Sequence, residues 1–256
     1  MTDHLSLQTR LAATFKDPHF YWWCGHVCLV CNSALYFSST LSLNANPIYH
    51  TRAYIGVLIS YAVVISKSIG DSSWFSKEFF RDENVQYFAL AFYWYSYQPM
   101  AVTLVPYFAF SIFHVFIYLR TILLPVFFPN NDNPTVKHAR EVIEQYTDEY
   151  HEKALQIAAY AEVVGILGRL IAGVLVFQTS ILALVVFIHF LRLRFYLSPY
   201  TRDAMYAVTA KLDELLLPPT SEPYIPVSAS RLYKNIRSIV IRYGATAQSA
   251  PPAVVE

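Results

Sequence analysis

Two ionisable side chains, Glu162 and Arg169, stand inside an otherwise apolar stretch of the chain. They are seven residues apart, which is nearly two helical turns, so they share one helix face at about 10.5 Å along the axis. Charges inside a membrane are candidates for ion or proton transfer. A small channel or transporter subunit could use such a pair in its lining. The alternative, which we favour, is that both charges bond to polar groups on neighbouring helices, or to each other through their long side chains.

A seam of small residues runs beside this pair. Small residues at three- and four-residue spacing let two helices approach closely in a membrane. We therefore expect the seam to pack against a neighbouring helix. Its members are Ala158, Ala161, Gly165, Gly168 and Ala172.

The sequence lacks the motifs of the common catalytic and metal centres. It contains no paired histidine boxes, no His-Glu-x-x-His, no Gly-x-Ser-x-Gly and no glycine-rich phosphate loop. We expect no catalytic residue, no bound metal, no cofactor and no enzymatic activity. A lipid-modifying enzyme is the less favoured alternative, because it would require His114, His189 and Glu162 to converge in one pocket.

The distribution of charge indicates a chain folded in lipid. Hydrophobic residues make up 55% and charged residues only 14%, against roughly 25% charged in soluble domains. All the charged residues except Arg52, Glu162 and Arg169 fall into four blocks, and each charge costs several kcal/mol at the bilayer centre. The pattern predicts an all-α polytopic membrane protein. The four blocks are Asp3–Asp17, Lys67–Glu83, Arg120–Lys153 and Arg192–Glu256.

The membrane domain, residues 20–197, divides into apolar regions that each contain a polar break. We expect three helical hairpins, at 20–66, 85–118 and 154–197. The arm Val85–Tyr97 would be only about 20 Å long as a helix, short of a roughly 30 Å hydrocarbon core, so it is either strongly tilted or re-entrant. The breaks are Asn44–Pro47, Gln98-Pro99 and Gln178–Ser180.

Hairpins of this kind would place all four charged blocks on one side of the membrane. Basic residues near the ends of spans favour the cytosolic side. We therefore expect a multi-pass protein with cytosolic termini, residues 1–19 forming the N-terminal one. Arg52 would reach an interface, and Asp132–Lys153 would form an amphipathic helix on the membrane that feeds the next span.

The C-terminal region predicts two amphipathic helices. The first covers residues 198–217, and residues 218–256 contain a linker, a basic amphipathic helix and a disordered end. A helix with one apolar and one basic face suits an anionic membrane surface. Packing against the membrane domain and binding to a soluble partner are the alternatives. The residues of this helix are Arg231, Leu232, Lys234, Ile236, Arg237, Ile239, Val240 and Arg242.

Two stretches resemble the transmembrane protein 33 family. One runs from Gln98 through the sequence Val-Pro-Tyr-Phe-Ala-Phe-Ser-Ile-Phe-His that ends at His114. The other is the sequence His-Phe-Leu-Arg-Leu-Arg-Phe at 189–195 with the amphipathic helix after it, joined by Ala161-Glu162 in the preceding span. The resemblance covers roughly Phe20 to Leu217, and its motifs are mostly apolar.

This resemblance implies a tetraspanning protein of the endoplasmic reticulum and nuclear envelope with cytosolic termini. It further implies association with the lipid bilayer, with reticulon-type curvature proteins, with nucleoporins and with an import receptor, and not with nucleic acid. The family supplies no catalytic residues to carry over. Our hypothesis is a non-enzymatic protein that shapes or stabilises curved membrane and supports nuclear pore distribution or organisation of the reticulum. The basic cluster of the tail is dispersed, which favours membrane contact over receptor contact.

Overall fold

The protein is helical throughout the parts that its computed structural model describes, which are residues 6–69, 77–129, 133–218 and 226–245. No β-strand occurs in these ranges, which confirms the all-α class. The chain divides into a first unit, Met1–Leu193, and a second unit, Arg194–Glu256. The predicted disordered end and most of the predicted linker lie outside the described residues.

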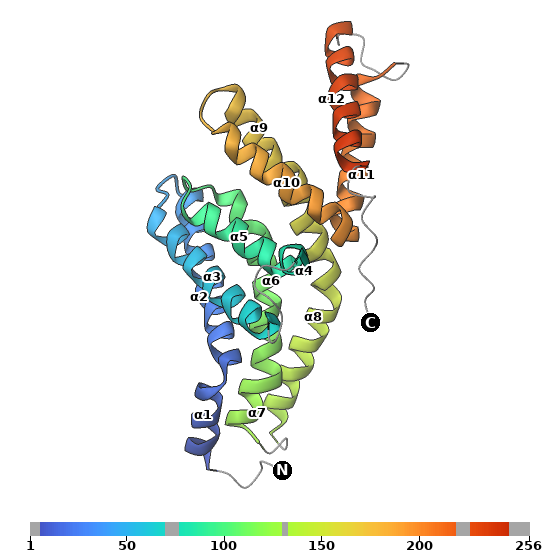
Figure 1. Ribbon diagram of the computed structural model, residues 1–256. Helices are drawn as coiled ribbons and strands as arrows, with labels where there is room; N and C mark the ends of the chain where they lie inside the picture. The colour runs from blue at the N-terminus through green and yellow to red at the C-terminus, as the bar shows by residue number, and fades with distance from the viewer. Residues whose placement is uncertain (1–5, 70–76, 130–132, 219–225, 246–256) are drawn as a thin grey trace. The chain divides into compact units, whose positions relative to one another are not determined.

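The helices follow the apolar runs of the sequence, with short polar segments between them (Figure 1). Two stretches, η1 and η2, are π-helical turns inserted into longer helices. In chain order the elements are α1 (Leu7–Lys16), α2 (Pro18–Leu41), α3 (Pro47–Ile69), α4 (Lys77–Arg81), α5 (Glu83–Tyr95), α6 (Ala101–Tyr118), η1 (Leu119–Leu123), α7 (Leu124–Phe127), α8 (Pro134–Tyr160), η2 (Ala161–Ile166), α9 (Leu167–Leu175), α10 (Ile181–Leu197), α11 (Pro199–Leu216) and α12 (Val227–Ala245).

Capping residues explain where several of these helices begin. The Asp17 side chain accepts a hydrogen bond from the His19 amide, and Pro18 occupies the first turn of α2. Asp82 caps α5 by accepting from the amides of Asn84 and Val85. A carboxylate at this position satisfies amides that have no partner within the helix and interacts favourably with the helix dipole. The acidic residues that border the apolar runs therefore also start the helices.

The lengths and compositions of the helices fit a polytopic membrane protein. Three helical stretches are long and apolar enough to cross a bilayer: Pro47–Ser68, Ala101–Phe127 and Pro134–Leu175. A fourth is added if α10 and α11, which are bent at the break between them, are counted as one broken span. The 24-residue α2 is not among them, because its aromatic, histidine and serine residues dilute its hydropathy. It nevertheless packs along α3.

The helix predicted before the last span continues into that span without a break. We expected Asp132–Lys153 to form an amphipathic helix on the membrane that feeds the next span. In the structure α8, η2 and α9 form one continuous helix of 42 residues from Pro134 to Leu175, about 63 Å long and twice the thickness of a hydrocarbon core. This continuity has a local cause, since no proline or glycine interrupts the chain between Thr135 and Tyr160.

Glycines bring the backbones of α2 and α3 into direct contact. A Cβ atom added to Gly56 would lie 2.5 Å from the Gly25 carbonyl oxygen, and one added to Gly25 would lie 2.7 Å from the Gly56 carbonyl oxygen. The Ser60 hydroxyl donates to the Trp22 carbonyl at 2.9 Å beside this crossing. Only residues without a side chain permit such an approach, so this glycine pair determines how α2 and α3 pack.

A methyl group at Gly56 should therefore destabilise the protein. We expect Gly56→Ala to lower the free energy of unfolding by about 1–3 kcal/mol, because two packed backbones must separate to admit it. The measurement is the thermal unfolding midpoint of the purified protein in detergent.

Gly168→Ala is the matched control, because a Cβ atom at Gly168 meets nothing within 4 Å. Alanine is a better helix former than glycine by roughly 1 kcal/mol, so this variant should keep or raise the midpoint. Equal midpoints for the two variants would contradict the close-packed crossing.

Candidate membrane-contacting site

The three hairpin breaks meet at one end of the first unit. The Gln98 side-chain amide donates to the Gln178 carbonyl at 3.2 Å, and the Ser180 amide donates to the Tyr97 hydroxyl at 3.1 Å. The Met100 amide donates to Nε2 of His50, near the start of α3, at 3.4 Å. The connections α2–α3 and α5–α6 lie at the same end in Figure 1. Hydrogen bonds thus join breaks that are some 50 to 80 residues apart in sequence.

Apolar side chains project from these hairpin tips. Leu43 is 96% exposed and Phe177 is 97% exposed, and each has a positive φ angle, 55° and 58°. A left-handed backbone costs a non-glycine residue of order 1–3 kcal/mol, yet here it presents large apolar groups outward. We name the exposed apolar residues at the first and third breaks the tip surface: Leu41, Leu43, Ile48, Leu175, Val176, Phe177, Ile181 and Leu182.

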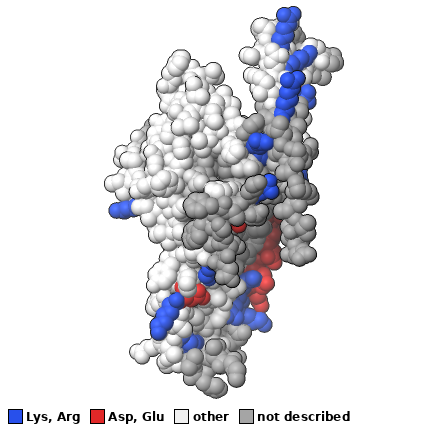
Figure 2. All heavy atoms as spheres, viewed as in Figure 1, with Lys and Arg blue, Asp and Glu red and all other residues white. Residues whose placement is uncertain are grey.

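Charge is concentrated away from the tip surface. Within the first unit, Figure 2 shows the face over α2, α3 and α5 almost free of charged residues, whereas such residues gather near α1, α7 and the first half of α8. Arg52 is an exposed exception in the second turn of α3. An uncharged tip and a charged opposite end are the arrangement that a bilayer and its headgroups would favour.

Buried polar groups join the helices inside the first unit. The Tyr54 hydroxyl donates to Thr103 Oγ1 at 2.8 Å, linking α3 to α6, and His26 Nδ1 lies 2.8 Å from Ser111 Oγ, linking α2 to α6. These contacts were not predicted from the sequence, because serine, threonine and tyrosine are scattered through every run. Buried polar atoms require partners, and here the partners lie on neighbouring helices.

The structure separates the environments of Glu162 and Arg169. Glu162 lies in the π-helical η2, is 1% exposed, and accepts a hydrogen bond from the Tyr87 hydroxyl at 2.7 Å. The Tyr107 hydroxyl donates to the Tyr87 carbonyl at 3.0 Å. Arg169, one helix further on, is exposed. Glu162 therefore joins η2 to α5 in the core, while Arg169 faces the surroundings of the protein.

The small-residue seam also has a packed part and an exposed part. Ala158 is 1% exposed, and a Cβ atom on Gly165 would lie 2.7 Å from a methyl group of Val102 in α6. Gly168 and Ala172 are exposed. The seam thus packs against α6 at its N-terminal end only.

The histidines singled out from the sequence lie in different surroundings. His114 packs against Trp22 and His26, whereas His189 is exposed on α10. In the part of the chain that the structure describes, no group of three or more histidine, cysteine, aspartate or glutamate residues is placed to hold a metal ion.

The second unit contains a helical hairpin fastened by one carboxylate. Asp213 of α11 accepts from the Tyr233 hydroxyl at 2.6 Å and pairs with the Arg237 guanidinium at 2.9 Å. The Ser230 hydroxyl donates to the Leu216 carbonyl at 2.7 Å. Burial raises the pKa of Tyr233 to about 12, assisted by the hydrogen bond to Asp213 and its charge, while Arg237 opposes the shift. Tyr233 therefore stays a hydrogen-bond donor at neutral pH.

This fastening leaves the apolar face of α12 uncovered within the second unit. Leu232, Ile236 and Ile239 are each at least half exposed. Arg237 pairs with Asp213 of α11. All four basic residues of the helix are exposed: Arg231, Lys234, Arg237 and Arg242. Val240 also belongs to α12.

Removing the donor to Glu162 should weaken the core. We expect Tyr87→Phe to lower the free energy of unfolding by about 1–3 kcal/mol, because a buried carboxyl group loses a hydrogen bond. The thermal midpoint in detergent measures this, and Tyr95→Phe on the exposed part of the same helix is the control. If Tyr87→Phe were as stable as Tyr95→Phe, the hydrogen bond would contribute nothing to the packing of η2 on α5.

Comparison of the sequence with known proteins shows the family of this chain. Tetra-spanning protein 1 of Schizosaccharomyces pombe is 33% identical over 96% of this chain and 93% of its own length. The pore membrane protein of 33 kDa of Saccharomyces cerevisiae is 27% identical, over 98% and 92%. Nucleoporin POM33 of Chaetomium thermophilum is 28% identical, over 90% and 85%. No solved structure matches the chain. The family model for transmembrane protein 33/nucleoporin POM33 matches residues 6–246, so the chain belongs to that family.

Proposed function

We propose that this protein is a non-enzymatic, multi-pass protein of the endoplasmic reticulum and nuclear envelope that shapes or stabilises curved membrane. The proposed location in the nuclear envelope is supported by relatives that are named as a pore membrane protein and as a nucleoporin. On the same basis we propose a role in nuclear pore distribution or organisation of the reticulum. Nucleoporins, reticulon-type curvature proteins and an import receptor are the partners that this proposal implies.

The apolar tip surface is the observation that carries the curvature proposal. Loops that enter an aqueous compartment expose polar residues, whereas Leu43 and Phe177 are almost fully exposed and apolar. Large apolar groups of this kind are stable in the interfacial layer of a bilayer. The tips then end within the lumenal leaflet, and the hairpins add little area beyond it.

The opposite end adds area to the cytosolic leaflet. The α8–η2–α9 helix is about twice as long as the hydrocarbon core is thick, and its charged N-terminal half packs beside α6 and η1. The amphipathic α12 adds a further surface element, with exposed Leu232, Ile236 and Ile239 on one side. Insertion of more protein area into one leaflet than into the other favours curvature toward the wider leaflet.

The proposed sidedness predicts which positions a membrane-impermeant thiol reagent reaches. In sealed microsomes, a single cysteine at Asn44 or Gln178 should react only after detergent is added, because the tips lie at the lumenal leaflet. A cysteine at the exposed Glu149 of α8 should react in intact vesicles.

The background for this experiment is the chain with Cys24, Cys28 and Cys31 replaced by serine. Thr179 is avoided because it is only 8% exposed. Labelling of either tip cysteine in intact microsomes would refute the proposed topology.

A further prediction concerns α12. In a peptide covering residues 198–256, Ile236→Asp with Ile239→Asp should weaken binding to liposomes that contain anionic lipid by at least about tenfold. The reason is that burial of each isoleucine contributes about 1.5–3 kcal/mol, and the new charges resist insertion. Co-sedimentation with the liposomes measures the binding.

Asn235→Asp with Ser238→Asp is the matched control, because it adds the same charge to the polar side of the same helix. This control should lose only the electrostatic part of the affinity, which salt screens. Equal losses in the two double variants would show that charge alone, and not the apolar face, governs binding.

A further inference from the structure

An arginine and a buried hydroxyl group meet at the turn between α9 and α10. Arg169 of α9 is exposed, and the ion pairs found among the described residues do not include it. Thr179, which lies in the turn, is only 8% exposed, and its Oγ1 has no hydrogen-bond partner in the part of the chain that the structure describes. Burial of a hydroxyl group without a partner is costly, so this position calls for a ligand.

A glycine creates the space that these two groups share. A Cβ atom added to Gly173 would lie 2.0 Å from Thr179 Oγ1 and 2.9 Å from Arg169 Nη1. The hydroxyl and the guanidinium therefore border the same point on the bare backbone of α9, although they are not bonded to each other. Any larger residue at Gly173 would occupy this point.

The backbone of the turn adds positive charge at the same place. The amides of Gln178 and Thr179 donate to the Gly173 carbonyl at 2.7 and 3.1 Å, which folds the turn over Gly173. The helix α10 begins directly afterwards, and the Ser180 hydroxyl accepts from the Leu182 amide at 3.2 Å. The N-terminus of a helix carries a partial positive charge and favours anions. A guanidinium, a hydroxyl donor and a helix N-terminus thus converge on one location.

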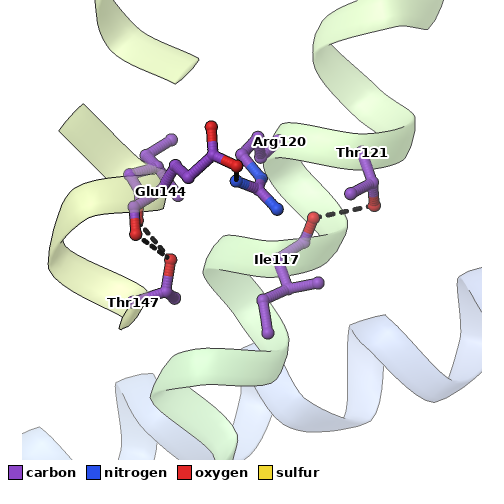
Figure 3. A network of polar contacts seen from close by, with 6 residues as sticks. Ile117, Arg120, Thr121, Glu144 and Thr147 are labelled. Atoms are coloured by element: carbon purple, nitrogen blue, oxygen red, sulfur yellow. Dashed lines mark hydrogen bonds and ion pairs between the residues drawn. The ribbon is translucent and has the colours of Figure 1, made fainter. Parts of the chain in front are cut away.

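The same residue types have internal partners at the other end of the first unit. Arg120 of η1 pairs with Glu144 of α8 at 2.8 Å (Figure 3). The hydroxyl groups of Thr121 and Thr147 donate to carbonyl oxygens of their own helices (Figure 3). Among the described residues, the arginine and the threonine at the third hairpin tip have neither kind of partner.

The depth of the site points to the phosphate layer of a bilayer. The Arg169 Cα lies about 9 Å from Leu175 at the end of α9, yet its guanidinium reaches Gly173, only about 3 Å from that end. A long basic side chain that extends toward the interface keeps its charge among the headgroups. The interfacial layer is roughly 5–8 Å thick on each side of the hydrocarbon core, so the tip and the guanidinium both fit within it.

The neighbouring side chains select a phosphate that carries apolar chains. Val176 is 59% exposed and Phe177 is 97% exposed, and both are apolar. A phosphate ion free in water gains nothing from such a surface, whereas a phospholipid places its glycerol and acyl chains against it. The chemistry of the site therefore suits the phosphate of a phospholipid.

We propose that Arg169 and Thr179, at the N-terminus of α10, bind the phosphate group of a phospholipid in the lumenal leaflet. The exposed Arg169 side chain shifts to admit a phosphate oxygen beside Gly173, where the Thr179 hydroxyl donates to it and the guanidinium forms charge-assisted hydrogen bonds. This contact holds the third hairpin tip at the depth of the phosphates. The choice of the lumenal leaflet rests on the proposed topology, whereas the binding of phospholipid phosphate does not.

Native mass spectrometry of the full-length protein tests this assignment. The protein is held in a maltoside detergent, which contains no phosphate, and the probes are phosphatidylcholine, diacylglycerol with the same acyl chains, and inorganic phosphate. One phosphatidylcholine should be retained several-fold more strongly than diacylglycerol, and inorganic phosphate at equal concentration should not displace it. Detergent exposes both ends of the protein, so the result does not depend on the topology.

Matched variants separate the hydroxyl and the guanidinium from general effects of charge. Thr179→Val should lower the apparent affinity for phosphatidylcholine by roughly tenfold, as expected for one hydrogen bond to a charged group, and Arg169→Gln by at least as much. Thr179→Ser keeps the hydroxyl and should retain binding. Arg52→Gln removes an equal charge from an exposed position at the same end of the first unit and should leave the affinity unchanged.

A second measurement checks the fold of the decisive variant. Without lipid, Thr179→Val should keep or raise the thermal unfolding midpoint, because the hydroxyl that it removes has no partner in the described part of the chain. A lower midpoint would assign the hydroxyl a structural role within the protein and would overturn the proposal.

Three results of the binding experiment would also overturn it. Equal retention of diacylglycerol and phosphatidylcholine would show that the tip recognises only apolar chains. Displacement of the lipid by inorganic phosphate would assign the site to the free ion. Equal losses in Arg169→Gln and Arg52→Gln would show that charge alone attracts the lipid. None of these results bears on the sidedness of the tips, which the thiol labelling measures separately.

Discussion

A hydrocarbon layer provides no hydrogen-bond partner, so backbone polar groups that enter it must find one within the protein, and buried side chains are stabilised when they do. This constraint accounts for the helical backbone of the chain and for the contacts between its helices. The carboxyl group of Glu162 accepts from Tyr87, and the Tyr54 hydroxyl donates to Thr103. Interhelical hydrogen bonds and close glycine contacts replace the hydrophobic effect as the forces that hold membrane helices together.

The same constraint gives the two ends of the first unit different characters. Charged side chains are stable only where water or headgroups reach them, and they gather near α1, α7 and the first half of α8. At the other end the hairpins turn back without charge, and the turns are joined by hydrogen bonds through Gln98, Gln178 and Tyr97. Ends of such different character would favour one orientation in a bilayer, which the proposed topology requires. The proposed curvature activity depends on this asymmetry, because a symmetric bundle would insert equal protein area into both leaflets.

In the second unit a single carboxylate joins an amphipathic helix to its neighbour. Asp213 holds Tyr233 and Arg237 and so joins α12 to α11. The fastening uses the side of α12 that carries polar groups, and it leaves Leu232, Ile236 and Ile239 exposed. The hairpin is thus held together without covering the face that we propose for the membrane.

The sequence alone determined the fold class and indicated the three breaks, because charge is costly in a membrane helix wherever the chain places it. It also contained enough of the family's motifs to indicate the family. Tertiary structure alone decided which polar groups meet. Glu162 and Arg169 share a helix face by periodicity, yet one packs against Tyr87 and the other is exposed, since neighbouring helices cover only part of that face. The crossing at Gly25 and Gly56 likewise depends on contacts between residues far apart in the chain, which no local pattern encodes.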